Sequence, residues 1–256
     1  YGIKNAILID STGIKKDRES LSTHLNKEIK KVILTAPGKS IPNIVYGVNH
    51  KDIDIDNEQI FSAASCTTNA IAPILHIINE NKKILSGHIE TIHAYTNDQN
   101  LLDNMHQKSR RGRAAAVNMV ITSTGAGKAI SKIIPSLEGK LTANAIRVPT
   151  PNGSLAIIHL NIEEKTSIIE IQELLRKAAL EGDLVNQIKY STNTELVSSD
   201  IIGTSGCAIF DSNSTLVGKN KKSITLYIWY DNEFGYTKQV IRLCKYISKV
   251  RRLHYY

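Results

Sequence analysis

The sequence has few cysteines, few aromatic residues and no long apolar segment. Its three cysteines, Cys66, Cys207 and Cys244, cannot all pair, and their spacing matches neither a disulfide framework nor a zinc site. Unpaired, reduced thiols are typical of a cytosol-like compartment, so we expect a cytoplasmic protein that holds no metal. No apolar run reaches the roughly 18 residues that cross a bilayer, which argues against a membrane protein.

The chain does carry an excess of positive charge. Among its 256 residues, 32 are lysine or arginine and 24 are aspartate or glutamate, which gives a formal net charge of +8. A basic surface attracts phosphate backbones. The lysines are scattered, however, and aromatic residues make up only 5% of the chain. We therefore expect a solvated basic surface and no nucleic-acid partner.

The first part of the chain has the pattern of a parallel α/β unit. Short apolar runs at 5–9 and 31–36 flank a polar stretch at 17–28 with helical character, which predicts a strand, a helix and a strand. Both runs end at turn-forming residues, at 11–13 and 37–38. Ligands of open parallel sheets sit at the carboxyl ends of the strands, so these turns are candidate ligand contacts.

Near Cys66 the pattern changes to longer strands with helices between them. A strand at 60–63 leads into a helix whose apolar residues recur at helical spacing through 78. Further elements are predicted at 89–93, 156–162, 208–210 and 224–230 as strands and at 168–180 and 241–250 as helices. The sequence thus predicts an α/β part followed by an α+β part with a mainly antiparallel sheet.

Cys66 is the strongest candidate for a reactive residue. Ser65 before it and the threonines at 67–68 suit a helix N-terminus, where the dipole and free N–H groups favour an anion. A thiol pKa near ~8.5 can fall to roughly 3.5–7.5 at such a position beside an imidazolium, so we expect a reactive thiolate at neutral pH. The alternative, a buried inert cysteine, fits Cys207 and Cys244 better, since both lie within apolar patterns.

Other candidates rest on weaker local patterns. His93 ends a strand-like run and can act as a base, although seven other histidines compete with it. The basic turn at 110–113 can clamp a phosphate or lie exposed as a solvated turn. The segment 123–127 opens a helix and offers donors to an anion, but it is too short for a dinucleotide or Walker fingerprint. The irregular segment 100–116 has the length of a functional or partner-contacting loop.

Six motifs stand in the order typical of one enzyme family. They are ASCTTN at 64–69, HAYTNDQ at 93–99, RRGRAAA at 110–116, STG at 123–125, RVPTPN at 147–152 and WYDNEFGY at 229–236. Together with the separation of Cys66 and His93, they show that the chain resembles phosphorylating glyceraldehyde-3-phosphate dehydrogenase. The resemblance covers essentially the whole chain.

The resemblance implies three regions. Residues 1–65 correspond to the C-terminal portion of a Rossmann NAD(P)-binding domain, 66–231 to the catalytic domain, and 232–256 to a C-terminal helix that packs back on the NAD(P)-binding domain. The family's Gly-rich phosphate loop would precede Tyr1, so we expect an N-terminally truncated chain that is inactive alone. Family members are homotetramers, in which the counterpart of 100–116 reaches a neighbouring subunit's cofactor.

The resemblance also implies a reaction. Cys66 is the nucleophile and His93 its activating base; a thioester forms after hydride leaves for NAD, and inorganic phosphate cleaves it. Glyceraldehyde-3-phosphate thereby becomes 1,3-bisphosphoglycerate. The implied contacts to the substrate phosphate are Thr96, Asp98 and Arg147. Those to inorganic phosphate are Ser65, Thr67, Arg111, Thr124 and Gly125. Those to the cofactor are Thr12, Gly13, Thr35 and Asn232.

Several alternatives stay open. Asn104-Met105 stands where Leu-Pro is frequent in NAD-specific members, which leaves use of NADP open. Relatives that act on erythrose-4-phosphate lose the Tyr-Thr and Ser-Thr-Gly that this chain keeps at 95–96 and 123–125. A cysteine protease would share the Cys–His pair and leave the phosphate contacts unexplained. The non-catalytic alternatives are an inactive fragment and an RNA-binding protein of the same fold.

Overall fold

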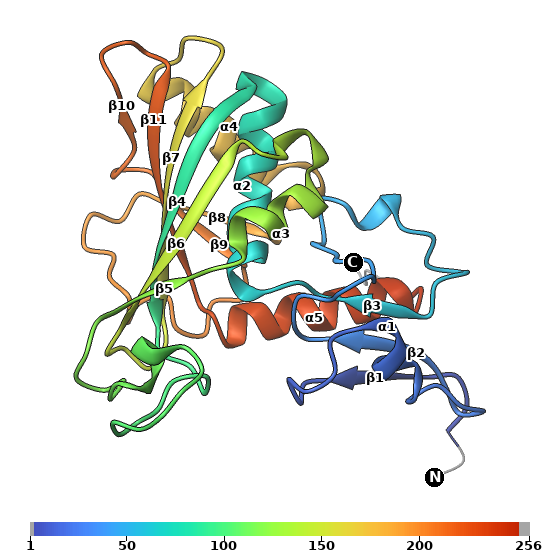
Figure 1. Ribbon diagram of the computed structural model, residues 1–256. Coiled ribbons are helices and arrows are strands. Elements are labelled where there is room, and N and C mark those ends of the chain that lie inside the picture. Colours follow the sequence, from blue (N-terminus) through green and yellow to red (C-terminus); the bar gives the residue numbers. More distant parts are fainter. Residues whose placement is uncertain (1–2, 251–256) are drawn as a thin grey trace.

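The computed structural model describes residues 3–250, which form two sheets joined near Cys66 (Figure 1). The smaller sheet has three parallel strands in the order β1-β2-β3. They are β1 (Ala6–Asp10), β2 (Ile29–Leu34) and β3 (Ile60–Ser62). This sheet fits a Rossmann-type part, so the parallel unit predicted from the sequence is confirmed.

The larger sheet has eight strands in the order β5-β6-β4-β7-β11-β9-β8, with β10 paired to β11. They are β4 (Ile84–Ala94), β5 (Val120–Ser123), β6 (Leu141–Val148), β7 (Ser154–Ile162), β8 (Ile188–Ser191), β9 (Ala208–Asp211), β10 (Leu216–Val217) and β11 (Ser223–Tyr230). Most neighbours are antiparallel, and β4–β6 and β8–β9 are parallel. The predicted α+β part with a mainly antiparallel sheet is therefore also confirmed.

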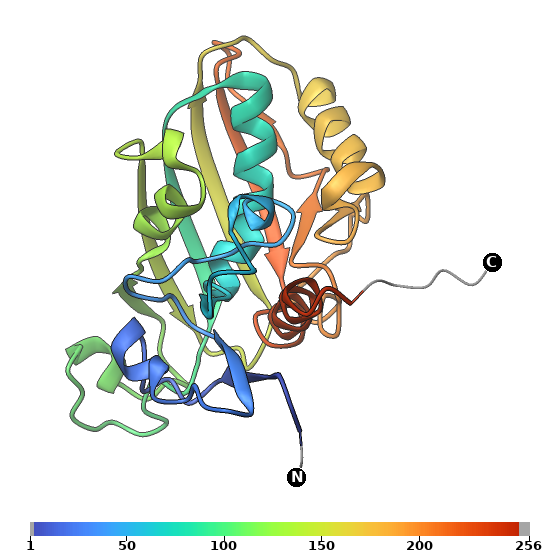
Figure 2. The ribbon, with the colours of Figure 1, turned by 90° about the vertical axis from the view of Figure 1, so that its right-hand side faces the viewer.

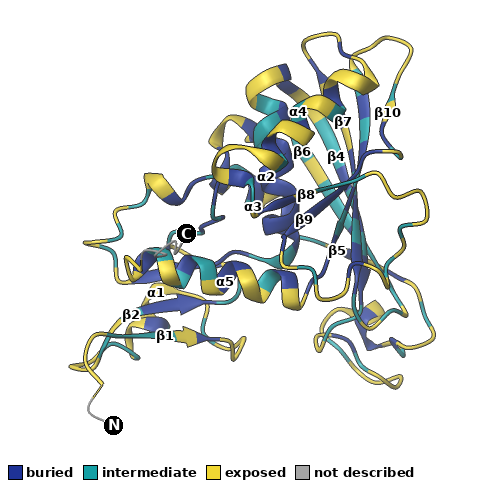
Figure 3. Ribbon diagram, turned by 180° about the vertical axis from the view of Figure 1, so that it is seen from behind, coloured by how far each residue is buried: buried dark blue, intermediate teal, exposed yellow. Residues whose placement is uncertain are grey.

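Three helices cover one face of the larger sheet (Figures 1 and 2). They are α2 (Cys66–Lys82), α3 (Ala126–Ile133) and α4 (Ile168–Leu180). Most apolar residues of α2 recur at helical spacing and are buried against strands β7, β9 and β11. Figure 3 shows the result as a buried layer between the sheet and helices whose outer faces are exposed. Burial of this face holds α2 against the sheet.

The smaller sheet packs differently on its two faces. On one face, α1 (Arg18–Ser22) contributes Leu21 to a cluster with residues of β2 and β3. On the other, α5 (Phe234–Ile247) contributes Val240, Leu243 and Ile247 to a cluster with Ile33 and other residues of the small-sheet region. The last helix of the chain thus rests on the first sheet.

Two predicted helices differ in extent from the observed ones. The helical stretch expected at 17–28 is wrong beyond Ser22, because the Asn26 side chain accepts the N–H groups of Glu28 and Ile29 and turns the chain into β2. The helix expected at 241–250 begins earlier, because the Asp231 carboxylate accepts the N–H of Phe234 and starts α5 there. Residues 251–256 of the predicted C-terminal region lie outside the described part of the chain.

Candidate active site

The turn between β3 and α2 presents Cys66 as the first residue of the helix. The Ser65 hydroxyl accepts the N–H of Thr68 at 3.1 Å and caps α2. The Asn69 side chain donates to the carbonyl oxygens of Ala63 (2.8 Å) and Ser65 (2.9 Å). Ala64, with φ of 56°, takes the left-handed conformation that turns the chain. These bonds fix the direction of the Cys66 side chain.

His93 lies at the end of β4 and faces this thiol. Its Nε2 is 3.5 Å from Sγ of Cys66, a hydrogen-bond distance for sulfur. The ring is buried and packs edge-on against Tyr230, with the ring centroids 5.8 Å apart. The pair predicted from the sequence is therefore brought together by two elements that are distant in the chain.

Arg147 lies beside His93 because β4 and β6 are parallel and in register at this pair. Nη1 of Arg147 is 2.6 Å from Nδ1 of His93 and donates to the Ala94 carbonyl oxygen at 2.9 Å. The same Nδ1 is 2.7 Å from that carbonyl oxygen. One nitrogen cannot both accept from Arg147 and donate to Ala94, so two tautomers of His93 compete. Only the tautomer protonated at Nδ1 leaves Nε2 free to take a proton from Cys66.

Burial shifts the pKa values of both members of this pair. Burial raises the pKa of Cys66, although the Thr67 hydroxyl and the charge of Arg147 act in the opposite direction. Burial, followed by the charge of Arg147, lowers the pKa of His93 to about 4. Both shifts favour the uncharged forms, a thiol and a neutral imidazole, because burial penalises both charges. The thiolate expected from the sequence therefore stays a prediction, and burial opposes it.

Arg111 and Asp98, assigned to different phosphates by the resemblance, form one ion pair. Nη1 of Arg111 contacts Oδ2 of Asp98, Nε donates to the Thr122 hydroxyl (3.0 Å), and Nη2 donates to the Ser123 carbonyl (3.3 Å). The Arg111 side chain is 10% exposed and that of Asp98 is 56% exposed. Burial lowers the pKa of Arg111, and the charge of Arg147 adds to this effect. The positive charges of Arg111 and Arg147 are therefore close enough to interact.

The remaining predicted anion contacts lie in turns around this group. Thr124 and Gly125 separate β5 from α3, and the Thr124 hydroxyl accepts the N–H of Ala126 at 3.2 Å. A side chain at Gly125 would meet no atom within 4 Å, so the space before α3 is open. Thr96 is half-buried in the turn after β4. Thr67 lies on α2 beside Cys66, and its hydroxyl is 3.0 Å from that of Tyr230.

The predicted cofactor residues Thr12, Gly13 and Thr35 gather at the carboxyl edge of the small sheet. The Asp10 carboxylate accepts from the N–H (2.9 Å) and the hydroxyl (2.7 Å) of Thr12, and its backbone carbonyl accepts the N–H of Thr35 (3.0 Å). Oδ2 of Asp10 also lies 3.0 Å from Nε2 of His24. Among residues 3–250, no hydrogen bond or ion pair joins this group directly to Cys66 or His93.

Asn232 is buried between β11 and α5 and is tied to the His93 strand. Ser154 donates to Oδ1 of Asn232 at 2.7 Å and accepts the N–H of Ala94 at 3.1 Å. Sequence reasoning missed Ser154, for which no local pattern exists. It also missed the role of Tyr230, although the alternation of β11 places this residue on the buried face of the strand.

Comparison with known proteins decides the family. Residues 65–232 match the family model described as the C-terminal domain of glyceraldehyde 3-phosphate dehydrogenase. The chain is 44% identical to glyceraldehyde-3-phosphate dehydrogenase 2 of Nostoc sp., over 95% of this chain and 72% of that protein. It belongs to the glyceraldehyde-3-phosphate dehydrogenase family. The resemblance seen in the six motifs is confirmed.

Other members of the glyceraldehyde-3-phosphate dehydrogenase family extend the comparison. A glyceraldehyde-3-phosphate dehydrogenase-like protein of Pseudomonas aeruginosa is 52% identical over 98% of this chain, which spans 54% of that relative. Glyceraldehyde-3-phosphate dehydrogenase of Neurospora crassa is 43% identical over 95% of this chain and 71% of its own length. The chain therefore spans about half of one relative and nearly three quarters of the others.

The region matched by the family model contains Cys66, His93, Arg111, Arg147 and Asn232. Within the described residues, no helix combines the length and apolarity needed to cross a bilayer. The same residues contain no group of three or more His, Cys, Asp or Glu side chains placed to hold a metal ion.

Proposed function

We propose that this chain carries the catalytic part of a phosphorylating glyceraldehyde-3-phosphate dehydrogenase, with Cys66 as nucleophile and His93 as base. The observation that supports it most directly is the 3.5 Å approach of Nε2 of His93 to Sγ of Cys66, with Arg147 against the other ring nitrogen. The substrate is glyceraldehyde-3-phosphate and the product 1,3-bisphosphoglycerate. A neutral Cys–His pair at a helix start suits a nucleophile that is deprotonated only as it attacks.

In the first step, His93 takes the Sγ proton of Cys66 on Nε2 while its Nδ1–H donates to the Ala94 carbonyl. The thiolate attacks the aldehyde carbon, and the N–H groups at the start of α2 favour the negative oxygen that forms. After loss of hydride the substrate is held as a thioester on Cys66. Attack by inorganic phosphate forms the new P–O–C bond, breaks the C–S bond and returns the thiolate.

Arg147 and Thr96 are proposed to hold the substrate phosphate. Nε of Arg147 is buried and has no hydrogen-bond partner among the described residues, which is an unmet donor beside the reacting thiol. For Asp98 we propose another role than the direct phosphate contact that the resemblance implies. Because its carboxylate repels phosphate and pairs with Arg111, we assign it to positioning that guanidinium.

Inorganic phosphate is proposed to bind near the starts of α2 and α3. Ser65 and Thr67 offer hydroxyls at the first helix, and Thr124 and Gly125 offer a hydroxyl and backbone N–H groups at the second. Arg111 supplies positive charge from its fixed place beside β5. An anion at a helix N-terminus is favoured by the dipole and the free N–H groups.

The site's residues fit a nicotinamide cofactor, NAD with NADP as the alternative. Asn232 is oriented by Ser154 beside the His93 strand, and open space surrounds Gly13 next to Thr12 and Thr35 at the edge of the parallel sheet. When bound, this cofactor accepts the hydride from the substrate carbon. In this arrangement Asn232 would hold the nicotinamide end, and Thr12, Gly13 and Thr35 the turns along the cofactor.

The assembly and the regional boundaries are part of the same proposal. We assign 1–65, 66–231 and 232–256 to cofactor binding, catalysis and a helix that braces the first region. We also propose a cytoplasmic homotetramer in which 100–116 contacts a neighbouring subunit. Measuring the oligomeric state by light scattering tests the last point, and a monomer would contradict it.

The acylation half-reaction tests the nucleophile without any cofactor. Incubated with 1,3-bisphosphoglycerate, Sγ of Cys66 should attack the acyl carbon, release phosphate and gain a phosphoglyceroyl group that mass spectrometry locates. Cys66→Ser should lose the stable adduct, whereas the matched control Cys207→Ser should keep it, because Cys207 is buried away from the site. An adduct that persists in Cys66→Ser would move the nucleophile elsewhere.

The redox half-reaction tests the substrate and the cofactor. We expect a phosphate-dependent reduction of NAD or NADP that is weak in this chain alone and is faster with glyceraldehyde-3-phosphate than with erythrose-4-phosphate. Faster turnover of the four-carbon aldehyde would favour the erythrose-4-phosphate alternative. Absence of acylation in a folded chain would favour an inactive member of the fold.

A further inference from the structure

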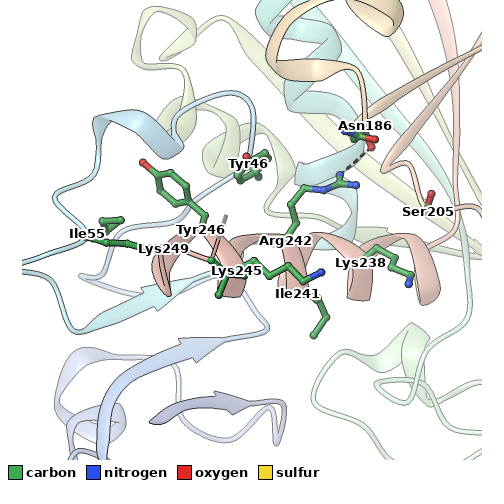
Figure 4. A pocket seen from close by; sticks show the side chains of 11 residues that line it. Tyr46, Ile55, Asn186, Ser205, Lys238, Ile241, Arg242, Lys245, Tyr246 and Lys249 are labelled. Carbon is green, nitrogen blue, oxygen red and sulfur yellow. Dashed lines mark hydrogen bonds between the residues drawn. The ribbon is translucent and has the colours of Figure 1, made fainter. Parts of the chain in front are cut away.

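A pocket lies along α5, and neither Cys66 nor His93 lines it. It has a volume of about 780 Å³ and opens between α5, the small-sheet region and the loops before β8 and β9. Figure 4 shows Tyr46, Tyr246 and Ile55 at one end and Lys238 and Ser205 at the other, with Arg242 and Lys245 between them. None of these residues belongs to the proposed catalytic group. The volume is within the range of small-molecule sites.

The pocket is strongly basic. Helix α5 contains Lys238, Arg242 and Lys245 and no acidic residue, and Lys249 follows it on the same side. Like charges three and four positions apart on a helix repel each other, so this arrangement weakens the free helix. A bound anion would remove that repulsion.

The four cations differ in their present partners. Among the described residues, no carboxylate lies within ion-pair distance of Lys238 or Lys245, and Lys238 packs over the Phe234 ring at 4.9 Å. Lys249 pairs with Asp56 at 2.6 Å, at the edge of the pocket. Two lysines are therefore available to a ligand without first breaking an ion pair.

Arg242 is fixed in the wall. Its Nη1 donates to the carbonyl of Asn186 (2.9 Å) and to the side-chain oxygens of Gln187 (2.6 Å) and Gln239 (2.9 Å). The guanidinium charge consequently stays in place whether or not the lysines move. A fixed guanidinium beside two lysines that form no ion pair within the described residues is suited to a multiply charged anion.

The other end of the pocket is aromatic. The rings of Tyr46 and Tyr246 are 5.8 Å apart, and His50 packs against both, at 4.2 Å and 4.9 Å. Ile55 and Ile241 add apolar surface. Tyr246 stands edge-on to both other rings, at interplanar angles of 77° and 67°, so a base would pack against one ring face and the edge of its neighbour. The pocket thus joins a cluster of cations to an aromatic end, which are the two features that a nucleoside phosphate needs.

We propose that this pocket binds a small ligand with two or three linked phosphates, with Lys238 and Lys245 on the phosphates and Arg242 behind them. Lys238 and Lys245 are about 10 Å apart along the helix axis, so linked phosphates would let each ammonium group contact a separate phosphate. The ligand is a nucleoside polyphosphate if the aromatic wall is used and an inorganic polyphosphate if it is not. The proposal does not depend on the reaction assigned to Cys66.

The test uses ATP, tripolyphosphate and inorganic phosphate as probes of the purified 256-residue chain. Binding is measured by calorimetry, and lysine acetylation followed by mass spectrometry locates the site. We expect ATP or tripolyphosphate to protect Lys238 and Lys245 from acetylation, and affinity to fall as salt is raised. Tighter binding of ATP than of tripolyphosphate would identify the nucleoside form, and equal binding the inorganic form.

A pair of double variants separates this site from general charge. Lys238→Gln with Lys245→Gln should weaken binding at least tenfold. Lys219→Gln with Lys222→Gln removes the same charge from the β10–β11 region and should leave binding unchanged, because both side chains are exposed and distant from the pocket (Figure 1). Circular dichroism checks that both variants fold.

Three results would overturn the proposal. They are undetectable binding of ATP and tripolyphosphate, equal binding by both double variants, and complete displacement of ATP by saturating NAD. The last result would assign the nucleotide to the cofactor edge near Thr12. Acylation of Cys66 is measured in parallel, so failure of this proposal and failure of the catalytic one are distinguishable.

Discussion

The ring of His93 has contacts on both sides that cannot all be satisfied at once. Nε2 faces Cys66, whereas Nδ1 lies between the Arg147 guanidinium and the Ala94 carbonyl. A substrate phosphate that engaged Arg147 would compete for its donors and leave Nδ1–H to Ala94. The substrate would then favour the tautomer that activates Cys66. Before substrate binds, the contact with Arg147 would favour the tautomer of His93 that cannot take the Cys66 proton. After substrate binds, the contact with Ala94 would favour the tautomer that can.

The first prediction concerns the pH dependence of Cys66 alkylation. Because burial raises the pKa of Cys66, the thiolate fraction should be small at pH 7 and should increase as the pH rises. We expect the rate of alkylation by iodoacetamide to increase roughly tenfold per pH unit between pH 6 and 8. Mass spectrometry of the Cys66 peptide measures it. A rate that is already level below pH 7 would show a resting thiolate.

A variant of Arg147 gives the second prediction, in which the pKa values of two residues rise together. The charge of Arg147 lowers the pKa of both Cys66 and His93. Arg147→Met should therefore slow the alkylation of Cys66 below its pKa and raise the pKa of His93 from about 4, as followed by NMR of the ring. Arg110→Met is the control, since Arg110 is exposed and lies outside this contact group. An unchanged alkylation rate of Cys66 together with an unchanged pKa of His93 would contradict the contacts assigned to Arg147.

At the scale of elements, α2 and α4 begin in the same way. The Ser65 hydroxyl accepts the N–H of Thr68 at 3.1 Å, and the Ser167 hydroxyl accepts that of Glu170 at 3.2 Å. We predict that Ser65→Ala and Ser167→Ala each lower the free energy of unfolding by about 1 kcal/mol, through loss of the cap. Chemical denaturation measures both.

Only one of these caps lies at the proposed site. Ser65→Ala should also slow acylation of Cys66, because the cap fixes the first turn of α2 and offers a hydroxyl to phosphate. Ser167→Ala serves as the matched control for stability. If both variants slowed acylation equally, the effect of Ser65 would be one of stability alone.

Elements with a strong local pattern could be predicted from the sequence. The helix at 168–180 was predicted with the observed bounds, and the strand at 224–230 agrees with β11 within one residue. The stretch 17–28 failed, since the Asn26 turn has no signal in apolar spacing. The start of α5 was missed because a side chain outside the helix, Asp231, supplies its first contacts.

The site was predictable only in part. The order of motifs indicates Cys66 and His93, and the structure places their side chains 3.5 Å apart. Sequence could not pair Arg111 with Asp98, because the contact depends on how an irregular loop folds back. It also could not supply the direction of the two pKa shifts, since the burial that causes them arises from the packing of distant strands.

At the scale of the whole molecule, the chain crosses between the two sheets at two places, from β3 to α2 and from β11 to α5. These crossings touch each other: the Tyr236 hydroxyl at the start of α5 donates to the Ala64 carbonyl at 2.8 Å. The contact lies two residues before Cys66. This hydrogen bond thus links the two sheets next to the proposed nucleophile.

The last prediction concerns a variant that removes this hydrogen bond. Tyr236→Phe leaves the buried Ala64 carbonyl without its partner and should lower the free energy of unfolding by about 1–3 kcal/mol. Tyr227→Phe is the matched control, because its hydroxyl has no hydrogen-bond partner within the described residues and the variant should be near neutral. Denaturation of both variants checks this, and equal stabilities would show that the contact contributes nothing.

The double crossing beside Cys66 has a mechanical consequence. Any rotation of one sheet relative to the other must bend the backbone next to Cys66. Even a small hinge motion would therefore separate Sγ of Cys66 from the His93 ring before the strands of either sheet unfold. Loss of chemistry should then precede loss of secondary structure as denaturant is added. The reactivity of Cys66 would therefore report on motion between the two sheets while the secondary structure is still intact.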